Sequence, residues 1–264
     1  MRLGDAPWTQ VRDALASGKP VVAILPCGAV EAHGPHLPLN TDVIISEAFA
    51  DAAAKHLNVA GDVHAFVLPA LAYAPAAYAA AFAGTIGIGT EKAKGVICDI
   101  ASALHSQGFG CLAFANSHFD PANVAMLREA AAEVAARGLK VAFADFTRRA
   151  LANTLTPEFV SGACHAGQFE TSIVLAARSD LVDDDARARL APNDLSLVDA
   201  MARGAKTFHE AGGPDAYFGA PAQASALEGR ATIEVMAAAL VGAVCATLNL
   251  TRASPDFAGA TGED

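Results

Sequence analysis

The sequence has few charged residues, and basic residues are the scarcer of the two signs. Only 17% of the 264 residues are charged, and 18 lysines and arginines face 28 aspartates and glutamates, for a formal net charge of -10. Nucleic acids and anionic membranes bind proteins through basic patches. We therefore expect neither a nucleic acid nor a membrane as partner, and we expect a small-molecule substrate instead.

The sequence also lacks a membrane-spanning run, a secretory signal and a disulfide pattern. One uncharged apolar stretch, residues 235–250, is shorter than the roughly 20 residues that cross a bilayer, and we expect a buried or interface helix there. The amino terminus shows no basic-then-apolar signal, and the five cysteines form neither a C-x-x-C pair nor a disulfide framework. We expect a cytoplasmic protein.

Apolar residues are abundant, at 53% of the chain. A chain of this length buries one large core, so we expect one domain over residues 1–264, with its core at about 20–250. The Ala-rich composition also suits burial between subunits, which predicts a homo-oligomer. The tail from residue 254, rich in glycine, aspartate and alanine, is expected to fray.

Apolar runs alternate with helical patterns along most of the chain, which is typical of βα units on a parallel sheet. We therefore predict an α/β protein, a three-layer α/β/α sandwich with a mostly parallel central sheet. The predicted strands are residues 21–25, 65–71, 111–115 and 141–144. One predicted helix starts at residue 42, and four others span residues 90–108, 121–138, 168–177 and 231–248. Residues 183–225 look less regular.

A group of possible metal ligands follows the first predicted strand. Glu31 and His33 lie two positions apart in the loop, and Asp42 follows at the start of a helix. In extended backbone, side chains two residues apart project to the same side. Open α/β sheets bind ligands beyond the carboxyl ends of their strands, so this loop is a candidate metal site.

A second pair of ligands, His118 and Asp120, follows the predicted strand at 111–115 with the same spacing. If the two strands are parallel neighbours, five ligands converge at one end of the sheet. Five are too many for a closed tetrahedral zinc site, but they suit two ions that share a carboxylate and keep positions open. Nitrogen and oxygen ligands of this kind suit zinc, manganese or iron.

Each of these residues also has an ordinary structural interpretation. Asp42 and Asp120 stand where carboxylates often cap helices. His118 could be a hydrogen-bonded core residue, and Glu170, near the start of a helix, could make only a favourable contact with the helix dipole. His36 is expected to shape the loop or to orient a ligand from behind.

Five sequence motifs resemble those of the creatininase (creatinine amidohydrolase) family. The longest, P-x-G-x-x-E-x-H-G-P-H-L-P-x-x-x-D, stands at residues 26–42. The others stand at residues 82–85, 116–120, 165–172 and 219–229. The resemblance covers residues 20–245 and implies a creatininase-like fold, hexameric assembly and two divalent ions per chain.

The resemblance implies a metal-dependent amidohydrolase that cleaves a non-peptide carbon–nitrogen bond. One ion would be bound by Glu31, Asp42 and His118, and the other by His33, Asp42 and Asp120. Asp120 stands where the family has a glutamate, so its oxygens are retracted by one methylene, and it could also receive a proton.

His165 and Glu170 complete the predicted catalytic residues. A histidine with a pKa near neutrality suits proton delivery to a leaving nitrogen, and Gly167 lets the backbone approach closely there. The resemblance implies that Glu170 belongs to the site, where it would either orient other groups or take part in the chemistry.

Similar chains include creatinine amidohydrolases, deformylases of formylamino-pyrimidines and peptidases that trim a modified precursor peptide. Creatinine itself is a doubtful substrate, because the only tryptophan is Trp8 and a polar S-x-x-H is replaced by Ala76 and Ala79. A larger or more apolar substrate is expected. A metal-stabilised binding protein without catalysis is the other alternative.

Overall fold

A four-stranded parallel sheet forms the centre of the computed structural model, which describes residues 1–250. Its order is β2-β1-β3-β4, and the strands are β1 (Val21–Cys27), β2 (His64–Val67), β3 (Cys111–Asn116) and β4 (Lys140–Phe143). Every residue of β1 and β3 is buried, as expected for central parallel strands covered on both faces. The predicted fraying tail lies outside the described residues.

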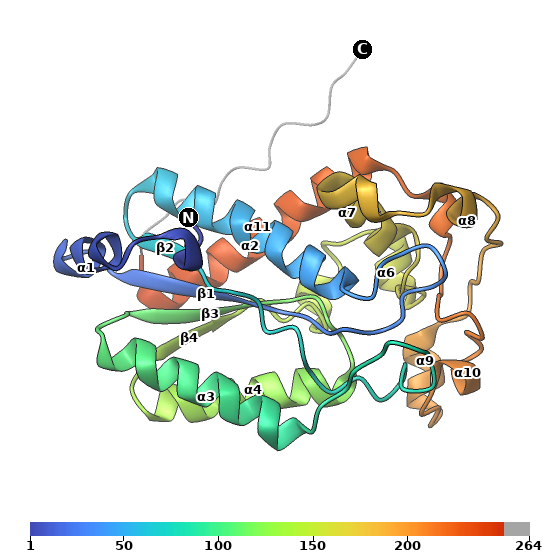
Figure 1. Cartoon of the computed structure of the whole chain (residues 1–264), viewed down its shortest axis with the longest axis horizontal. Coiled ribbons are helices and arrows are strands. Elements are labelled where there is room, and N and C mark those ends of the chain that lie inside the picture. Colours follow the sequence, from blue (N-terminus) through green and yellow to red (C-terminus); the bar gives the residue numbers. More distant parts are fainter. Residues whose placement is uncertain (251–264) are drawn as a thin grey trace, which may run out of the picture.

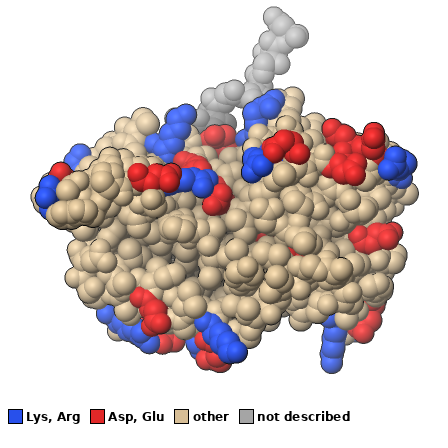
Figure 2. Space-filling view, viewed as in Figure 1, with Lys and Arg blue, Asp and Glu red and all other residues tan. Residues whose placement is uncertain are grey.

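Helices cover both faces of the sheet, which confirms the predicted three-layer α/β/α sandwich (Figure 1). One face carries α2 (Thr41–Ala60), α7 (Gln168–Arg178) and α11 (Ala226–Leu248). The other carries α3 (Thr90–Ser106) and α4 (Pro121–Ala136), with α1 (Trp8–Ala16) packed against the same core. Figure 2 shows charged side chains mainly along the edges of one face of the molecule, with few in its middle.

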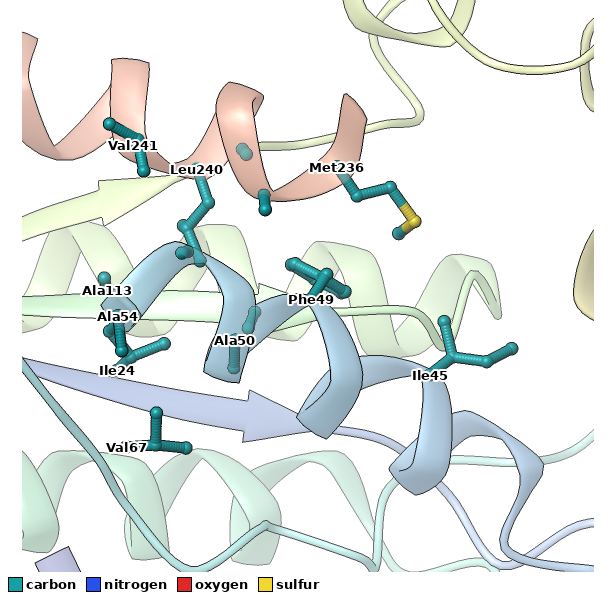
Figure 3. Close-up of a cluster of buried hydrophobic side chains, with 14 of the residues drawn as sticks. Ile24, Ile45, Phe49, Ala50, Ala54, Val67, Ala113, Met236, Leu240 and Val241 are labelled. Carbon is teal, nitrogen blue, oxygen red and sulfur yellow. The ribbon is translucent and has the colours of Figure 1, made fainter. Parts of the chain in front are cut away.

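Small residues in the core between the sheet and α2 allow the two layers to pack closely (Figure 3). Ile24 and Val67 from the sheet meet Phe49 of α2 and Leu240 of α11, and all four are at most 1% exposed. Ala50 and Ala54, on the same stretch of α2, are fully buried. A second cluster fills the space under α3 and α4. This packing fixes α2, whose first turn carries Asp42.

Helix α11 is long and apolar enough to satisfy the length and composition of a membrane span. In the structure it packs against α7, α2, β3 and β4, which agrees with the expectation of a buried helix. At Gly229 the contact with α7 is so close that a Cβ atom would overlap the carbonyl oxygen of Ser172. The core therefore depends on a glycine there.

Short helices gather beyond the carboxyl ends of the strands (Figure 1). One 3₁₀ turn, η1 (Leu3–Asp5), lies instead beside α1. The elements at the carboxyl ends are α5 (Arg149–Ala152), α6 (Pro157–Ser161), α8 (Asp184–Ala188), α9 (Leu197–Ala202), α10 (Phe208–Ala211), and the 3₁₀ turns η2 (Ser179–Leu181) and η3 (Pro221–Gln223). A small core that includes Leu197, Phe208 and Phe218 holds α9 and α10. These elements cover the end of the sheet where the predicted ligands lie.

Candidate metal centre

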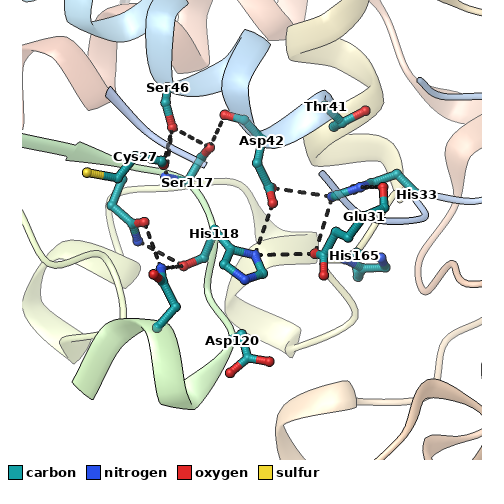
Figure 4. Close-up of polar contacts among 12 residues, drawn as sticks. Cys27, Glu31, His33, Thr41, Asp42, Ser46, Ser117, His118, Asp120 and His165 are labelled. Carbon is teal, nitrogen blue, oxygen red and sulfur yellow. Dashed lines mark hydrogen bonds and ion pairs between the residues drawn. The ribbon is translucent and has the colours of Figure 1, made fainter. Parts of the chain in front are cut away.

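Parallel pairing of β1 with β3 brings the two predicted ligand loops side by side. Cys27, at the end of β1, is in register with Asn116, at the end of β3. Hydrogen bonds then tie α2 to both strand ends, since the Ser46 hydroxyl donates to the Cys27 carbonyl over 2.6 Å and Ser117 donates to the Asp42 carbonyl over 2.6 Å. Figure 4 shows Glu31, His33, Asp42 and His118 pointing toward one another. All four are at most 3% exposed.

Asp42 faces two histidines with two different oxygens. Its Oδ1 lies 3.3 Å from Nε2 of His33, and its Oδ2 lies 3.0 Å from Nδ1 of His118. A carboxylate that turns one oxygen to each side in this way is suited to bridge two ions. Among the described residues, no lysine or arginine pairs with this carboxylate.

Backbone carbonyls fix which ring nitrogen of each histidine is free. Nδ1 of His33 lies 3.1 Å from the Glu31 carbonyl oxygen, and Nε2 of His118 lies 2.6 Å from the Pro75 carbonyl oxygen. A carbonyl only accepts, so both of these nitrogens carry a proton. The remaining atoms, His33 Nε2 and His118 Nδ1, are turned toward carboxylates, and each would offer a lone pair to an ion once it carries no proton. Metal-binding histidines are oriented by such contacts through the nitrogen that does not bind the ion.

The buried carboxylates of the cluster favour positive charge beside them. Burial by itself lowers the pKa of His33, but the carboxylates of Asp42, Glu170 and Glu31 outweigh burial and raise this pKa to about 10. The pKa of His118 is raised well above its usual value in the same way, by Glu31 and Asp42 against burial. Nε2 of His33 and Oδ2 of Asp42 are buried without a hydrogen-bond partner. Divalent ions would meet this requirement.

Three groups of ligand atoms have the right size for such ions, and one of them, Glu31, His33 and His165, shares residues with the two described next. Glu31, Asp42 and His118 make one group, and His33, Asp42 and Glu170 make the other, each with its atoms within 4.8 Å of one another. Glu31 Oε1 lies 3.3 Å from His118 Nδ1, and His33 Nε2 lies 3.6 Å from Glu170 Oε2. Ligands about 2.1 Å from a tetrahedral ion are about 3.4 Å apart. The residues present therefore fit two ions that share Asp42.

Asp120 lies outside these groups, and Figure 4 shows its carboxylate apart from the cluster, beyond the ring of His118. Its Oδ1 accepts the N–H of Ala122 over 2.8 Å at the start of α4, so the helix-capping interpretation is realised. Its Oδ2 is buried without a hydrogen-bond partner, and Asp120 lines the same cavity as His118. Ligation by Asp120 thus stays a prediction, whereas Glu170 lies within ligand distance of His33.

His165 lies between the cluster and an apolar wall. Its ring is 4.3 Å from that of His33 and 4.3 Å from that of Phe208, centroid to centroid. Its Nε2 donates to the Ala32 carbonyl over 2.9 Å, which leaves Nδ1 as a proton acceptor. Burial, followed by the nearby His33, lowers the pKa of His165 to about 4. A neutral His165 must receive a proton before it can deliver one.

Glu158 is a site residue that the sequence did not reveal. Its carboxylate accepts the N–H groups of Gln168, Phe169 and Ala220 over 2.9, 2.8 and 2.7 Å. These bonds join the start of α7, which carries Glu170, to the loop at 219–221. No local pattern predicts contacts that span ten and sixty-two residues. Nε2 of His36 lies 2.9 Å from the hydroxyl of Thr171, and the orienting role expected of His36 stays a prediction.

A cavity of about 70 Å³ opens onto the cluster. Its polar side includes Glu31, Asp42, Ser117, His118, Asp120, His165 and Glu170. Its other side is apolar and comes from the loops and from α9 and α10. The cavity therefore places a substrate bond within reach of the ligand cluster.

The fold and the site together define a class: α/β proteins with a buried cluster of carboxylate and imidazole groups at the carboxyl ends of the central strands. The chain belongs to the creatininase family. Residues 4–244 match the family's sequence model, described as creatininase (creatinine amidohydrolase). The predicted family membership and the creatininase-like fold are confirmed.

Two kinds of relative match at similar identity. The chain is 29% identical over 221 residues to creatinine amidohydrolase of Pseudomonas putida, covering 75% of this chain and 81% of the relative. It is 30% identical over 244 residues to mycofactocin precursor peptide peptidase of Mycobacterium tuberculosis, covering 89% and 86%. The relatives thus support a creatininase-family hydrolase and leave the substrate bond open.

Solved creatininase structures share the whole fold. A crystal structure of creatinine amidohydrolase superposes with a TM-score of 0.73 at 27% identity, over 92% of this chain and 96% of that chain. A manganese creatininase gives 0.71 at 26%, over 92% and 97%. A Zn-Zn form of a mutant creatininase gives 0.67 at 27%, over 92% and 96%.

Proposed function

We propose that this protein is a dinuclear metal-dependent amidohydrolase that cleaves a non-peptide carbon–nitrogen bond in a small amide, cyclic amide or formamide. The observation that carries this proposal is the placement of Asp42, whose two oxygens face the free nitrogens of His33 and His118. Such a bridging carboxylate serves two ions, and two-ion sites commonly activate water for hydrolysis.

Glu31, Asp42 and His118 would hold one ion, and His33, Asp42 and Glu170 the other. Asp120, with a free oxygen on the cavity wall, would add a ligand or a base beside His118. Zinc, manganese or iron suits these ligands, and manganese and zinc occur in the related creatininases. When bound, the two ions would polarise the substrate carbonyl and lower the pKa of water.

His165 would move the proton. In hydrolysis the water oxygen forms a bond to the carbonyl carbon, the carbon–nitrogen bond breaks, and a proton from water ends on the nitrogen. Nδ1 of His165 is free to accept that proton, because Nε2 is held by the Ala32 carbonyl. The same nitrogen can then donate it to the leaving amine. The Oδ2 atom of Asp120 is the competing base.

The test combines elemental analysis with substrate screening. Purified protein loaded with zinc or manganese is assayed against lactams, hydantoins, creatinine and formamides, and ion content is measured on the same sample. We expect two ions per chain and hydrolysis of at least one class. His165→Ala should slow turnover of that substrate at least about a hundredfold while it keeps both ions. Full activity in this variant would remove the proton-transfer role.

We expect creatinine to be a poor substrate. Trp8 lies on α1, near the amino ends of the strands in Figure 1, and is 73% exposed, so it cannot cover a ligand in the cavity. Ala76 and Ala79 are buried and offer no polar group to a guanidino ring. Sites that lack the polar partners of a substrate lose much of their selectivity for it. Creatinine hydrolysis as efficient as that of every other amide screened would contradict this argument.

A peptidase that trims a modified precursor peptide is the second candidate, favoured by the 30% identity over 89% of the chain. Hydrolysis of short peptides in preference to all small amides would support it. A metal-stabilised binding protein is the non-enzymatic alternative, and it predicts a single four-ligand ion without turnover.

We also propose a cytoplasmic location and a homo-oligomer, as the composition suggests.

A further inference from the structure

We infer that the substrate carries an uncharged apolar group, branched aliphatic or aromatic, next to the bond that is cleaved, and that α9 and Phe208 select this group. The inference rests on the proposed function and deepens it. It starts from the half of the cavity that the ligand cluster does not use. That half is lined by Tyr78, Phe119, Leu197, Val198, Met201 and Phe208.

Helix α9 supplies one wall of this apolar half. Met201 lies three residues after Val198 and four residues after Leu197, so the three side chains share a face of the helix. All three line the cavity. The helix is anchored by the Ser196 hydroxyl, which accepts the N–H of Asp199 over 3.1 Å, and by the N–H of Leu197, which donates to the Gly162 carbonyl over 2.9 Å.

Phe208 supplies another, well-buried part of the apolar wall. It is 3% exposed and lies against the rings of Phe218 and Tyr78, at 5.9 and 6.1 Å between centroids. Its backbone N–H donates to the Tyr78 carbonyl over 3.0 Å. Because its ring also lies 4.3 Å from that of His165, centroid to centroid, an apolar group against Phe208 would lie directly beside the proposed proton carrier.

The charges of the cavity exclude an ionic group at this place. Among the described residues that line it, there is no lysine or arginine. Four carboxylates line it, those of Glu31, Asp42, Asp120 and Glu170, and two divalent ions would balance their formal charge. An anionic substituent finds no unpaired cation, and a cationic one would be buried against an apolar wall at a large cost. Apolar contact with this wall is therefore the interaction that would select among substrates.

Calorimetric titration of the zinc-loaded protein with hydroxamic acids tests the inference without turnover. Hydroxamates bind metal ions, and their acyl chain can be varied from acetyl to 4-methylpentanoyl. We expect Kd to fall about fourfold for each added methylene, the fold-change that corresponds to about 0.8 kcal/mol of transfer free energy. The monohydroxamate of succinic acid should bind no more tightly than acetohydroxamic acid.

Val198→Asp is the informative variant, because Val198 is 57% exposed at the cavity and the change does not disturb a buried core. It should flatten the dependence of Kd on chain length. Val59→Asp is the matched control, since Val59 is 80% exposed on α2 and does not line the cavity. It should keep the dependence. A Kd that is independent of chain length, or a dependence that Val198→Asp leaves unchanged, would overturn the inference.

Hydrolysis assays separate this inference from the proposed function. Carboxamides and N-alkylformamides with the same chains are assayed with the same protein. Chain-length-dependent binding of hydroxamates without hydrolysis of any amide would reject the amidohydrolase while the apolar subsite stands. Hydrolysis of amides with no preference for longer chains would reject the apolar subsite while the amidohydrolase stands.

Discussion

Oδ2 of Asp42 lies 3.0 Å from Nδ1 of His118, and the other ring nitrogen of His118 is already committed to a backbone carbonyl. A carboxylate oxygen and an imidazole lone pair repel each other at this distance unless a proton or a cation lies between them. The surrounding acidic groups make a cation the better-suited partner. This pair is therefore the simplest place to test metal binding.

Asp42→Asn should remove or weaken both ions, because one amide cannot replace a bridging carboxylate. Mass spectrometry under non-denaturing conditions should show close to two divalent ions in the natural protein and fewer than one in the variant. Asp51→Asn is the control, since Asp51 lies on the same helix and pairs with Arg2 at the surface. One tightly held ion in fully active protein would contradict the two-ion arrangement.

Glu170→Gln and Asp120→Ala should have different effects. Glu170→Gln removes a ligand oxygen 3.6 Å from His33 Nε2 and should weaken one ion at least about tenfold. Asp120→Ala should cost about 1 kcal/mol of stability through the lost cap of α4, with a smaller effect on the ions. Metal titrations and thermal denaturation of both variants measure this. Loss of an ion in Asp120→Ala alone would assign the second site to Asp120.

The sequence predicted the layers and most helix boundaries because capping residues and apolar runs are local signals. The predicted strand at 65–71 is shorter in the structure, where β2 ends at Val67, because Pro69 has no N–H for a ladder. Helix α11 starts at Ala226 instead of 231, since Ser225 caps it by accepting the N–H of Glu228. The latter is a capping-box pattern that sequence reading could have used.

The candidate site was only partly predictable. Glu31, His33, Asp42 and His118 follow two strands, and the pairing of those strands brings them together. Glu170 lies on α7, which reaches the site through packing against α2 and α11, so only the family motif at 165–172, and not its spacing from the other ligands, pointed to its place in the site. The three contacts of Glu158 are equally non-local.

Glu158→Gln should destabilise the start of α7. The variant side chain has one oxygen for three N–H groups, and its amide would face a donor. Loss of hydrogen bonds to a charged group costs roughly 1.5–3 kcal/mol, and denaturant titration should show a loss of that size. Glu129→Gln, at a side chain that is 61% exposed, should change stability little. Equal stability of the two variants would mean that Glu158 does not hold α7.

Two glycines of α11 should respond in opposite directions to alanine. In Gly229→Ala the new Cβ overlaps the Ser172 carbonyl, which should cost about 1–3 kcal/mol or more. In Gly242→Ala the Cβ meets nothing within 4 Å, so helix propensity should stabilise the protein by about 1 kcal/mol. Thermal denaturation gives both signs. A stabilised Gly229→Ala variant would show that α11 and α7 are less closely packed in solution.

The protein should assemble into an oligomer larger than a dimer. Charged side chains are sparse in the middle of the face in Figure 2, and large apolar side chains such as Trp8, Val59 and Val160 are more than half exposed. Burial of such surface favours association. Sedimentation velocity at micromolar concentration measures the state, and an active monomer would contradict the prediction.

The three histidines around the cavity are all held by main-chain oxygens, those of Glu31, Pro75 and Ala32. No exchange of one amino acid for another can delete a carbonyl. An alanine scan would therefore not detect the carbonyls that orient the rings. Substitutions in neighbouring side chains would leave these carbonyls in place. The orientations of the three rings should therefore tolerate substitution at Glu31, Pro75 and Ala32 as far as these contacts are concerned, whereas an insertion or deletion that shifts these loops should change them.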